Sequence, residues 1–165
     1  MAERMLYLDY AASTPVDASV LDRMREVAES NCANPSSTHA AGREAQDIIA
    51  ATAEQLGRLL NVHPGTLVWT SGATESDNLA IAGGARHRAH RGKHLVTMKT
   101  EHKAVTDMFE TLEKEGFEVT WVEPDSNGLV SPDVFAAALR DDTQLASIMF
   151  VNNETGVIQD IEALG

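Results

Sequence analysis

The chain has 165 residues, 43% of them hydrophobic and 23% charged, a balance typical of a globular protein with a sizeable core. Its 25 acidic residues outnumber 13 basic ones and give a net charge of −12, which argues against a nucleic acid partner. It contains no apolar run long enough to cross a bilayer and no signal-peptide pattern, so we expect a cytoplasmic protein without a membrane partner. The single cysteine, Cys32, allows no internal disulfide, and nothing near it marks it as a nucleophile.

The first third of the chain predicts two helices. Asp17 is a helix-capping residue, and the apolar residues after it are spaced as the inner face of a helix: Val20, Leu21, Met24, Val27 and Ala28. A loop over residues 31–37 follows, and Ser37 or Thr38 is expected to cap a second helix that ends near residues 61–64. Its apolar stripe comprises Ala45, Ile49, Ala53, Leu56 and Leu60.

A short apolar run, Thr66–Thr70, is typical of a buried strand, and residues 70–78 follow it with the sequence Thr-Ser-Gly-Ala-Thr-Glu-Ser-Asp-Asn. The next residues have the pattern of a helix with Leu79, Ile81, Ala82 and Ala85 on its apolar side. Such a turn places free backbone N–H groups and the positive end of a helix dipole where a phosphate could dock. Thr74 and Asp77 also fit a helix-capping box, which is the commoner reason for such a turn.

Strands then alternate with helices. Strands are expected at residues 95–97, 117–121 and 144–151, the last being a near-continuous apolar run typical of a parallel strand covered on both faces. A helix with Val105, Met108, Phe109 and Leu112 on one face should stop at Gly116, and a second should run from Ser131–Pro132 to Leu139. This alternation predicts an α/β fold with a mostly parallel sheet flanked by helices.

The last residues predict a further helix, which Asp160 would cap and of which only the first turn is present. We therefore expect the chain to be one portion of a larger fold. We divide it into an N-terminal segment, residues 1–16, and an incomplete domain, residues 17–165.

Polar residues follow three of the predicted strands. They are Ser71–Thr74, Thr100–His102 and Asn152–Glu154. Because ligands of open α/β sheets bind at the carboxyl ends of the strands, we expect these segments to converge on one pocket. Taken alone, a histidine after a strand is more often a helix cap, and Asn-Asn-Glu is more often a turn.

Five motifs between Tyr7 and Asp160 occur together in one known family. They are Leu8–Ala12 with Thr14–Pro15, Asn34–Ser37 with His39 and Gly42, Thr70–Asn78, Lys99–His102, and Val151–Glu154 with Gly156. As a set they resemble the cysteine desulfurases, which are class V aminotransferase-like enzymes of fold type I that use pyridoxal 5′-phosphate (PLP). The resemblance implies that residues 17–165 are the N-terminal portion of the PLP-binding large domain.

The resemblance also implies roles for individual residues. Ala73 and Thr74 match the positions that hold the PLP phosphate, and His102 matches the histidine that stacks over the pyridine ring and transfers protons. Asn153 matches an amide that contacts PLP or the bound amino acid, whereas Asn152 could simply hold the turn. In such enzymes PLP is the electron sink, and a separate cysteine takes the sulfur of L-cysteine, which leaves alanine and a protein persulfide. A sulfur-acceptor or scaffold protein would be a partner, in iron–sulfur cluster assembly or tRNA thiolation. No metal site is expected.

Several family residues have no counterpart before Gly165. These are the Schiff-base lysine, the aspartate on the pyridine nitrogen, the arginine for the substrate carboxylate and the persulfide cysteine; the lysines present are Lys93, Lys99, Lys103 and Lys114. We therefore expect the chain to be inactive alone, and to act as a homodimer or with a chain that carries the missing part. Two alternatives are a non-catalytic remnant that modulates an intact desulfurase and another class V enzyme such as a selenocysteine lyase.

Overall fold

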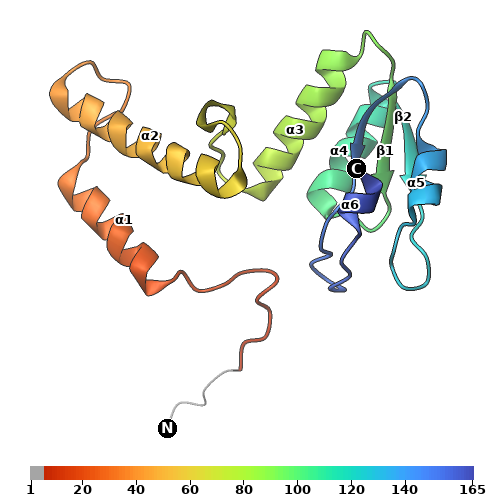
Figure 1. The fold of residues 1–165 in the computed structure, drawn as a ribbon, viewed down its shortest axis with the longest axis horizontal. Coiled ribbons are helices and arrows are strands. Elements are labelled where there is room, and N and C mark those ends of the chain that lie inside the picture. Colours follow the sequence, from red (N-terminus) through yellow and green to blue (C-terminus); the bar gives the residue numbers. More distant parts are fainter. Residues whose placement is uncertain (1–5) are drawn as a thin grey trace. The chain divides into compact units, whose positions relative to one another are not determined.

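The computed structural model describes residues 6–165 and divides the chain into two compact units, the first ending at Trp69 and the second comprising Thr70–Gly165 (Figure 1). The division at residue 16 that the sequence suggested stays a prediction. No helix among residues 6–165 is both long and apolar enough to cross a membrane.

The first unit holds the helices α1 (Ala18–Ser30) and α2 (Ala40–Leu60) and the 3₁₀ turn η1 (Pro64–Thr66). The Asp17 carboxylate accepts a hydrogen bond from the Ser19 amide at 2.8 Å, which confirms the predicted N-cap of α1.

The predicted cap of α2 is wrong, because the loop continues past Ser37 and Thr38. The cap is His39, whose Nδ1 accepts from the Gly42 amide at 3.2 Å. The helix ends as predicted, at Asn61, which adopts a left-handed conformation with φ of 54°.

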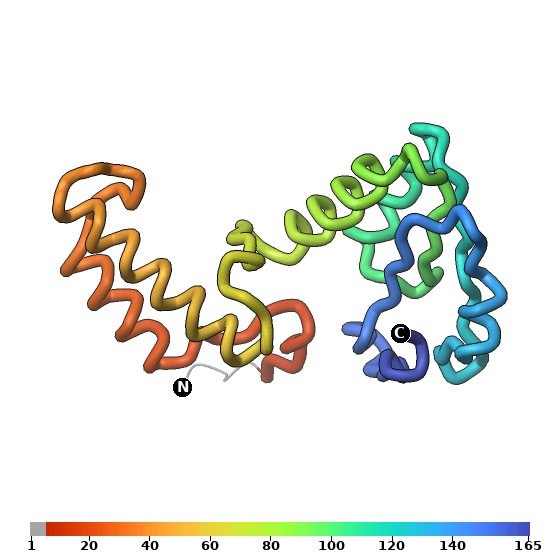
Figure 2. Tube along the Cα trace, turned by 45° about the horizontal axis from the view of Figure 1, so that its top comes forward, coloured from red at the N-terminus to blue at the C-terminus, as the bar shows by residue number. Residues whose placement is uncertain are grey.

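The described part of the first unit has no apolar core of its own. Within residues 6–69 only Gly42 and Gly57 are buried. The predicted inner face of α1 is therefore not an inner face in this structure: Leu21 is 47% exposed and Met24 60% exposed. Part of this face lines a shallow hollow shared with α2, and the backbone of both helices can be followed in Figure 2. The helical periodicity is sufficient to form the helix, but α2 lies against only part of its apolar side, which stays largely exposed.

The strand predicted over Thr66–Thr70 is not formed. The structure has η1 at its start and irregular backbone from residue 67 to 70, with Val68 69% and Trp69 55% exposed. A strand requires a hydrogen-bonding neighbour, and no described strand pairs with this run. Its composition alone therefore does not produce a strand.

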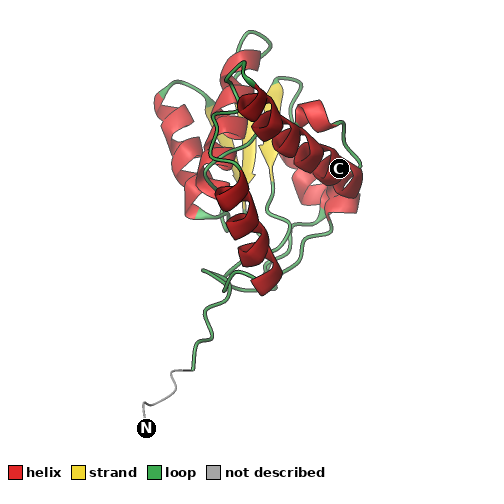
Figure 3. Cartoon of the chain, turned by 90° about the vertical axis from the view of Figure 1, so that its left-hand side faces the viewer, coloured by secondary structure: helices red, strands yellow, loops and turns green. Residues whose placement is uncertain are grey.

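The second unit is an α/β layer structure, as predicted. Its elements in chain order are α3 (Ala73–Arg88), β1 (His94–Met98), α4 (Lys103–Lys114), β2 (Glu118–Val122), α5 (Pro132–Ala138), β3 (Thr143–Ser147) and α6 (Ile161–Leu164). The three strands are parallel in the order β2-β1-β3, and Figure 3 shows them in yellow among the helices in red. Gly116 ends α4 with φ of 89°, and Ser131 and Asp160 cap α5 and α6 as predicted.

Two apolar clusters fill the spaces on either side of the sheet. One contains residues of α3, α4 and β1: Ile81, Ala85, Leu95, Val105, Phe109 and Leu112, with Phe117 beside them. The other contains Val96 and Met98 of β1 with Val122, Val130 and Phe135, against which Leu164 of α6 packs. Leu95 thus belongs to one cluster and Val96 and Met98 to the other, and all five residues of this central strand are buried.

The third strand is shorter and less covered than the sequence predicts. It ends at Ser147 instead of continuing to Val151, and none of its residues is fully buried. Val151 instead forms an isolated antiparallel bridge with Ile158. The reason is position: β3 is at an edge of the described sheet, so its outer side has no neighbour.

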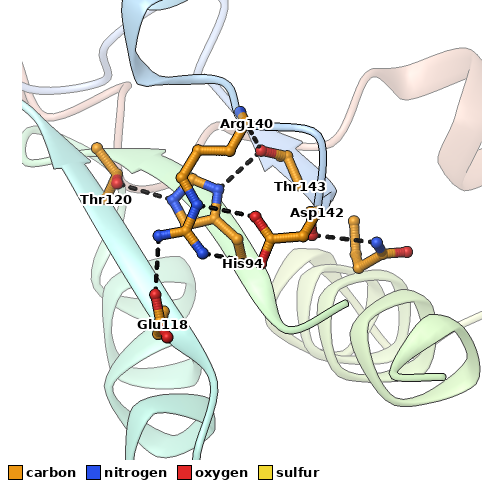
Figure 4. Close-up of polar contacts among 7 residues, drawn as sticks. His94, Glu118, Thr120, Arg140, Asp142 and Thr143 are labelled. Carbon is orange, nitrogen blue, oxygen red and sulfur yellow. Dashed lines mark hydrogen bonds and ion pairs between the residues drawn. The ribbon is translucent and has the colours of Figure 1, made fainter. Parts of the chain in front are cut away.

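A polar network ties the amino ends of the three strands together (Figure 4). The fully buried His94 ring makes hydrogen bonds with the Thr143 hydroxyl at 2.7 Å and the Thr120 hydroxyl at 2.8 Å. The Arg140 guanidinium donates to both carboxylate oxygens of Asp142 and to Glu118, each at 2.8 Å. Burial, and then the positive charge of Arg140, lowers the pKa of His94, so this histidine is held as a neutral ring.

Candidate functional site

The carboxyl ends of β1 and β3 lead into a cavity of about 310 Å³. Two loops line it, one between β1 and α4 and one after β3. The lining residues are Lys99, Thr100, Glu101, His102, Lys103, Asn152, Asn153, Glu154 and Thr155. Two of the three segments that we expected to converge are therefore together at the edge of the sheet where ligands of α/β folds bind.

His102 lies directly before α4 and caps it. Its Nδ1 accepts a hydrogen bond from the Ala104 amide at 3.1 Å. A ring nitrogen that accepts carries no proton, so the neutral ring has its proton on Nε2. The helix cap and a chemical role are compatible, because the cap uses one ring nitrogen and leaves the other to a ligand.

Asn152 holds the turn after β3. Its Oδ1 accepts from the amides of Glu154 at 3.0 Å and Thr155 at 2.8 Å, and its Nδ2 donates to the Thr100 carbonyl at 2.8 Å. This is the structural role that the sequence left open for it. The same turn brings Asn153 to the lining of the cavity that contains His102.

Glu101 is the lining residue whose importance the sequence did not reveal. Its partly buried side chain accepts a hydrogen bond from the Met149 amide through the carboxylate. Burial raises the pKa of Glu101 to about 7, the hydrogen bond from Met149 opposes that rise, and the negative charge of Asp77 on α3 adds to it. The available signal was its position between Thr100 and His102, directly after a buried strand.

Ala73 and Thr74 are the first two residues of α3 and are not among the residues that line this cavity. The predicted capping box of Thr74 and Asp77 is wrong, because the helix already begins at Ala73 and both residues lie inside it. Glu75 instead reaches back and accepts from the amide and hydroxyl of Ser71, both at 2.6 Å. These bonds lower the pKa of Glu75.

The start of α3 differs from that of the other long helices. The N-cap position is Gly72, and no side chain caps the helix, whereas side chains cap α1, α2 and α4. A methyl group on Gly72 would meet nothing within 4 Å. The first N–H groups of a helix point outward beyond its N-terminal end and have no partner within the helix. The start of α3 therefore offers open space and backbone donors suited to an anion.

A larger hollow of about 570 Å³ lies in the first unit, between the last turn of α2 and η1. It contains none of the residues that the sequence predicted for a site. Within residues 6–165, no group of three or more His, Cys, Asp and Glu side chains is arranged to hold a metal ion.

The family of the chain follows from comparison with known proteins. The model of the aminotransferase class-V family matches residues 6–165, so the chain belongs to this family. This agrees with the resemblance deduced from the five motifs and with the parallel α/β fold.

Two curated relatives have the name Cysteine desulfurase IscS. The protein of Methylococcus capsulatus is 53% identical over 161 residues, and that of Vibrio vulnificus is 53% identical over 163 residues. Each match covers 97% of this chain but 40% of the relative. The chain thus spans about two fifths of the length of these relatives.

Solved structures agree with the fold. The structure described as SspA in complex with cysteine superposes with a TM-score of 0.90 at 41% identity, covering 96% of this chain and 46% of that one. A NifS-like protein gives a TM-score of 0.90 at 36% identity, covering 93% of this chain and 42% of that one. The fold is therefore that of fold-type I cysteine desulfurases, of which this chain represents less than half.

Proposed function

We propose that the chain is the N-terminal portion of a cysteine desulfurase, which uses PLP to remove sulfur from L-cysteine and leaves alanine and a protein persulfide. The observation that carries this proposal is the cavity at the carboxyl edge of the sheet. His102 and Asn153, far apart in the sequence, both line it, and they are the residues that the desulfurase motifs single out. The sulfur would serve iron–sulfur cluster assembly or tRNA thiolation in the cytoplasm.

The residues present fit PLP. The uncapped start of α3 supplies backbone N–H groups at Ala73 and Thr74, and the Thr74 side chain adds a hydroxyl, which together suit a phosphate dianion. When bound, PLP supplies the electron sink for the chemistry at the amino acid. Thr74 and Ala73 would hold its phosphate, and His102 and Asn153 would contact its ring.

His102 is suited to proton transfer in this site. Its Nδ1 is occupied by the Ala104 amide, which fixes the ring at the start of α4 and leaves Nε2 to exchange a proton with a ligand. The Asn153 amide can donate or accept, so it can orient a ligand without changing its charge.

We propose that the Schiff-base lysine and the persulfide cysteine are supplied by the three fifths of the relatives' length that this chain does not span. Two lysines near the cavity are already engaged, Lys103 with Asp107 at 2.7 Å and Lys99 with Glu123. The active species would be a complex with a chain that carries the remaining part, or a homodimer in which each subunit also contains that part.

Substitutions in the assembled enzyme test these roles. His102→Ala should strongly reduce alanine formation while leaving the circular dichroism spectrum nearly unchanged, because the ring acts in proton transfer. Thr74→Ala should weaken PLP retention by about 0.5–1.5 kcal/mol, the net value of one hydrogen bond, or somewhat more for a charged acceptor. His90→Ala, a change at an exposed histidine outside the cavity, is the matched control. Normal turnover in His102→Ala would remove the catalytic assignment.

A further inference from the structure

Two side chains tie the loops of the cavity together. The Glu101 carboxylate of the β1–α4 loop accepts from the Met149 amide, which follows β3. In the opposite direction, the Asn152 amide donates to the Thr100 carbonyl at 2.8 Å. These bonds are reciprocal: each loop contributes one side chain and one backbone group. The two side chains directly precede His102 and Asn153 in the sequence, and both of these residues line the cavity.

The Glu101 bond is the stronger candidate for control of this geometry, because it involves a charged acceptor in a partly desolvated position. A hydrogen bond to an ionised group is roughly twice as strong as a neutral one. In the structure the cations nearest to the cavity do not neutralise Glu101, since Lys99 and Lys103 form ion pairs with Glu123 and Asp107. The titratable groups that surround it are Asp77 on α3 and, along the cavity, Lys99, His102, Lys103 and Glu154.

We propose that Glu101 is a positioning residue: its carboxylate fixes the turn after β3 against the β1–α4 loop, so that His102 and Asn153 line one cavity. The hydrogen bond between the Met149 amide and the Glu101 carboxylate lies within this chain and does not depend on the proposed function. Only the effect of this bond on cofactor and substrate binding rests on that function.

The strength of the hydrogen bond from Met149 to Glu101 depends on pH near neutrality, since the pKa of Glu101 is raised to about 7. Above this pH the carboxylate is ionised and accepts the charge-assisted bond from Met149. Below it, the neutral acid accepts a weaker bond, so the turn after β3 becomes freer.

Hydrogen–deuterium exchange of the Met149 amide in the full chain tests the proposal. Glu101→Leu removes the acceptor and should speed exchange about tenfold, the equivalent of one net hydrogen bond. Glu101→Gln keeps a carbonyl acceptor and should restore most of the protection. Glu154→Leu, a change at another acidic residue that lines the cavity, is the matched control and should leave Met149 unchanged.

A comparison at pH 6 and pH 8, corrected for intrinsic exchange, separates this role from a purely structural one. Wild-type protein should protect Met149 more at pH 8, whereas Glu101→Gln should show equal protection at both, and this comparison holds even if Glu101→Leu does not fold. Equal protection of Met149 in wild type and Glu101→Leu, or a pH dependence retained in Glu101→Gln, would overturn the proposal.

In the assembled enzyme, loss of positioning should raise KM more than it lowers kcat. If the Met149 amide exchanges as predicted but the assembled enzyme binds no PLP, the positioning role of Glu101 is supported and the proposed function fails.

Discussion

His94 provides a quantitative test of how the second unit is held together. Substitution of His94 by Leu keeps a similar volume and removes both ring nitrogens. The hydrogen bonds to the hydroxyls of Thr120 and Thr143 are then lost, while Thr143 still accepts from the Arg140 amide at 2.7 Å. Two net hydrogen bonds of about 0.5–1.5 kcal/mol each give an expected loss of about 1–3 kcal/mol.

Urea unfolding followed by circular dichroism measures this loss. With a slope of about 2 kcal/mol per molar urea, the midpoint should fall by about 0.5–1.5 M without a change in slope. His87→Leu, on an exposed position of α3, is the matched control and should stay within about 0.5 kcal/mol of wild type.

A double-mutant cycle tests the pairing itself. Thr120→Val alone should destabilise the protein, because it leaves the buried His94 Nε2 without its partner. After His94→Leu the same change should cost less, with a coupling energy of about 0.5–1.5 kcal/mol. If the two substitutions were additive, or if His94→Leu unfolded at the midpoint of the control, the network would not stabilise the sheet as argued here.

Three further outcomes are expected. Gly42→Ala should destabilise α2, because the new Cβ would lie 2.3 Å from the Ser37 carbonyl oxygen. Gly83→Ala, whose Cβ would meet nothing within 4 Å, should instead stabilise the helix by up to about 1 kcal/mol. The two substitutions should shift the thermal unfolding temperature in opposite directions, and shifts in the same direction would refute this. For pH, the lowered pKa of His94 means that its contribution is complete above about pH 6.5 and is lost as the pH falls from there through the lowered pKa of the folded state, whereas the raised pKa of Glu101 favours the folded state as the pH falls from 7 to 4.5. Glu101→Gln should therefore lose stability on acidification more steeply than wild type in urea titrations, and an identical slope would contradict the raised pKa of Glu101. The isolated chain should sediment as oligomers or aggregates, because its edge strand and apolar helix faces are uncovered, and a stable monomer would refute this.

The sequence predicted the parts of the fold that depend on local signals. The i, i+3, i+4 spacing of Val105, Met108 and Phe109 identifies α4. Asp17 and Ser131 mark helix starts with their own side chains. Such signals need no knowledge of the distant chain, because a helix makes its hydrogen bonds within itself.

The predictions that failed depend on neighbours. The run before Thr70 has strand composition but no pairing partner among the described strands, and within residues 6–165 the apolar face of α1 stays largely exposed. In the site, His102 and Asn153 were found through motifs, whereas the bond from Met149 to Glu101 joins residues far apart in sequence and carries no local pattern. Burial, which makes Glu101 unusual, is likewise a property of the folded chain.

The most direct test of the account is to purify the tagged chain from its native host and identify every co-purifying polypeptide by mass, together with any bound PLP. We predict a stoichiometric partner that carries the Schiff-base lysine and the persulfide cysteine, and a complex that converts L-cysteine to alanine. Recovery with an intact, full-length desulfurase, or a complex with the lysine-bearing partner that holds no PLP, would contradict it.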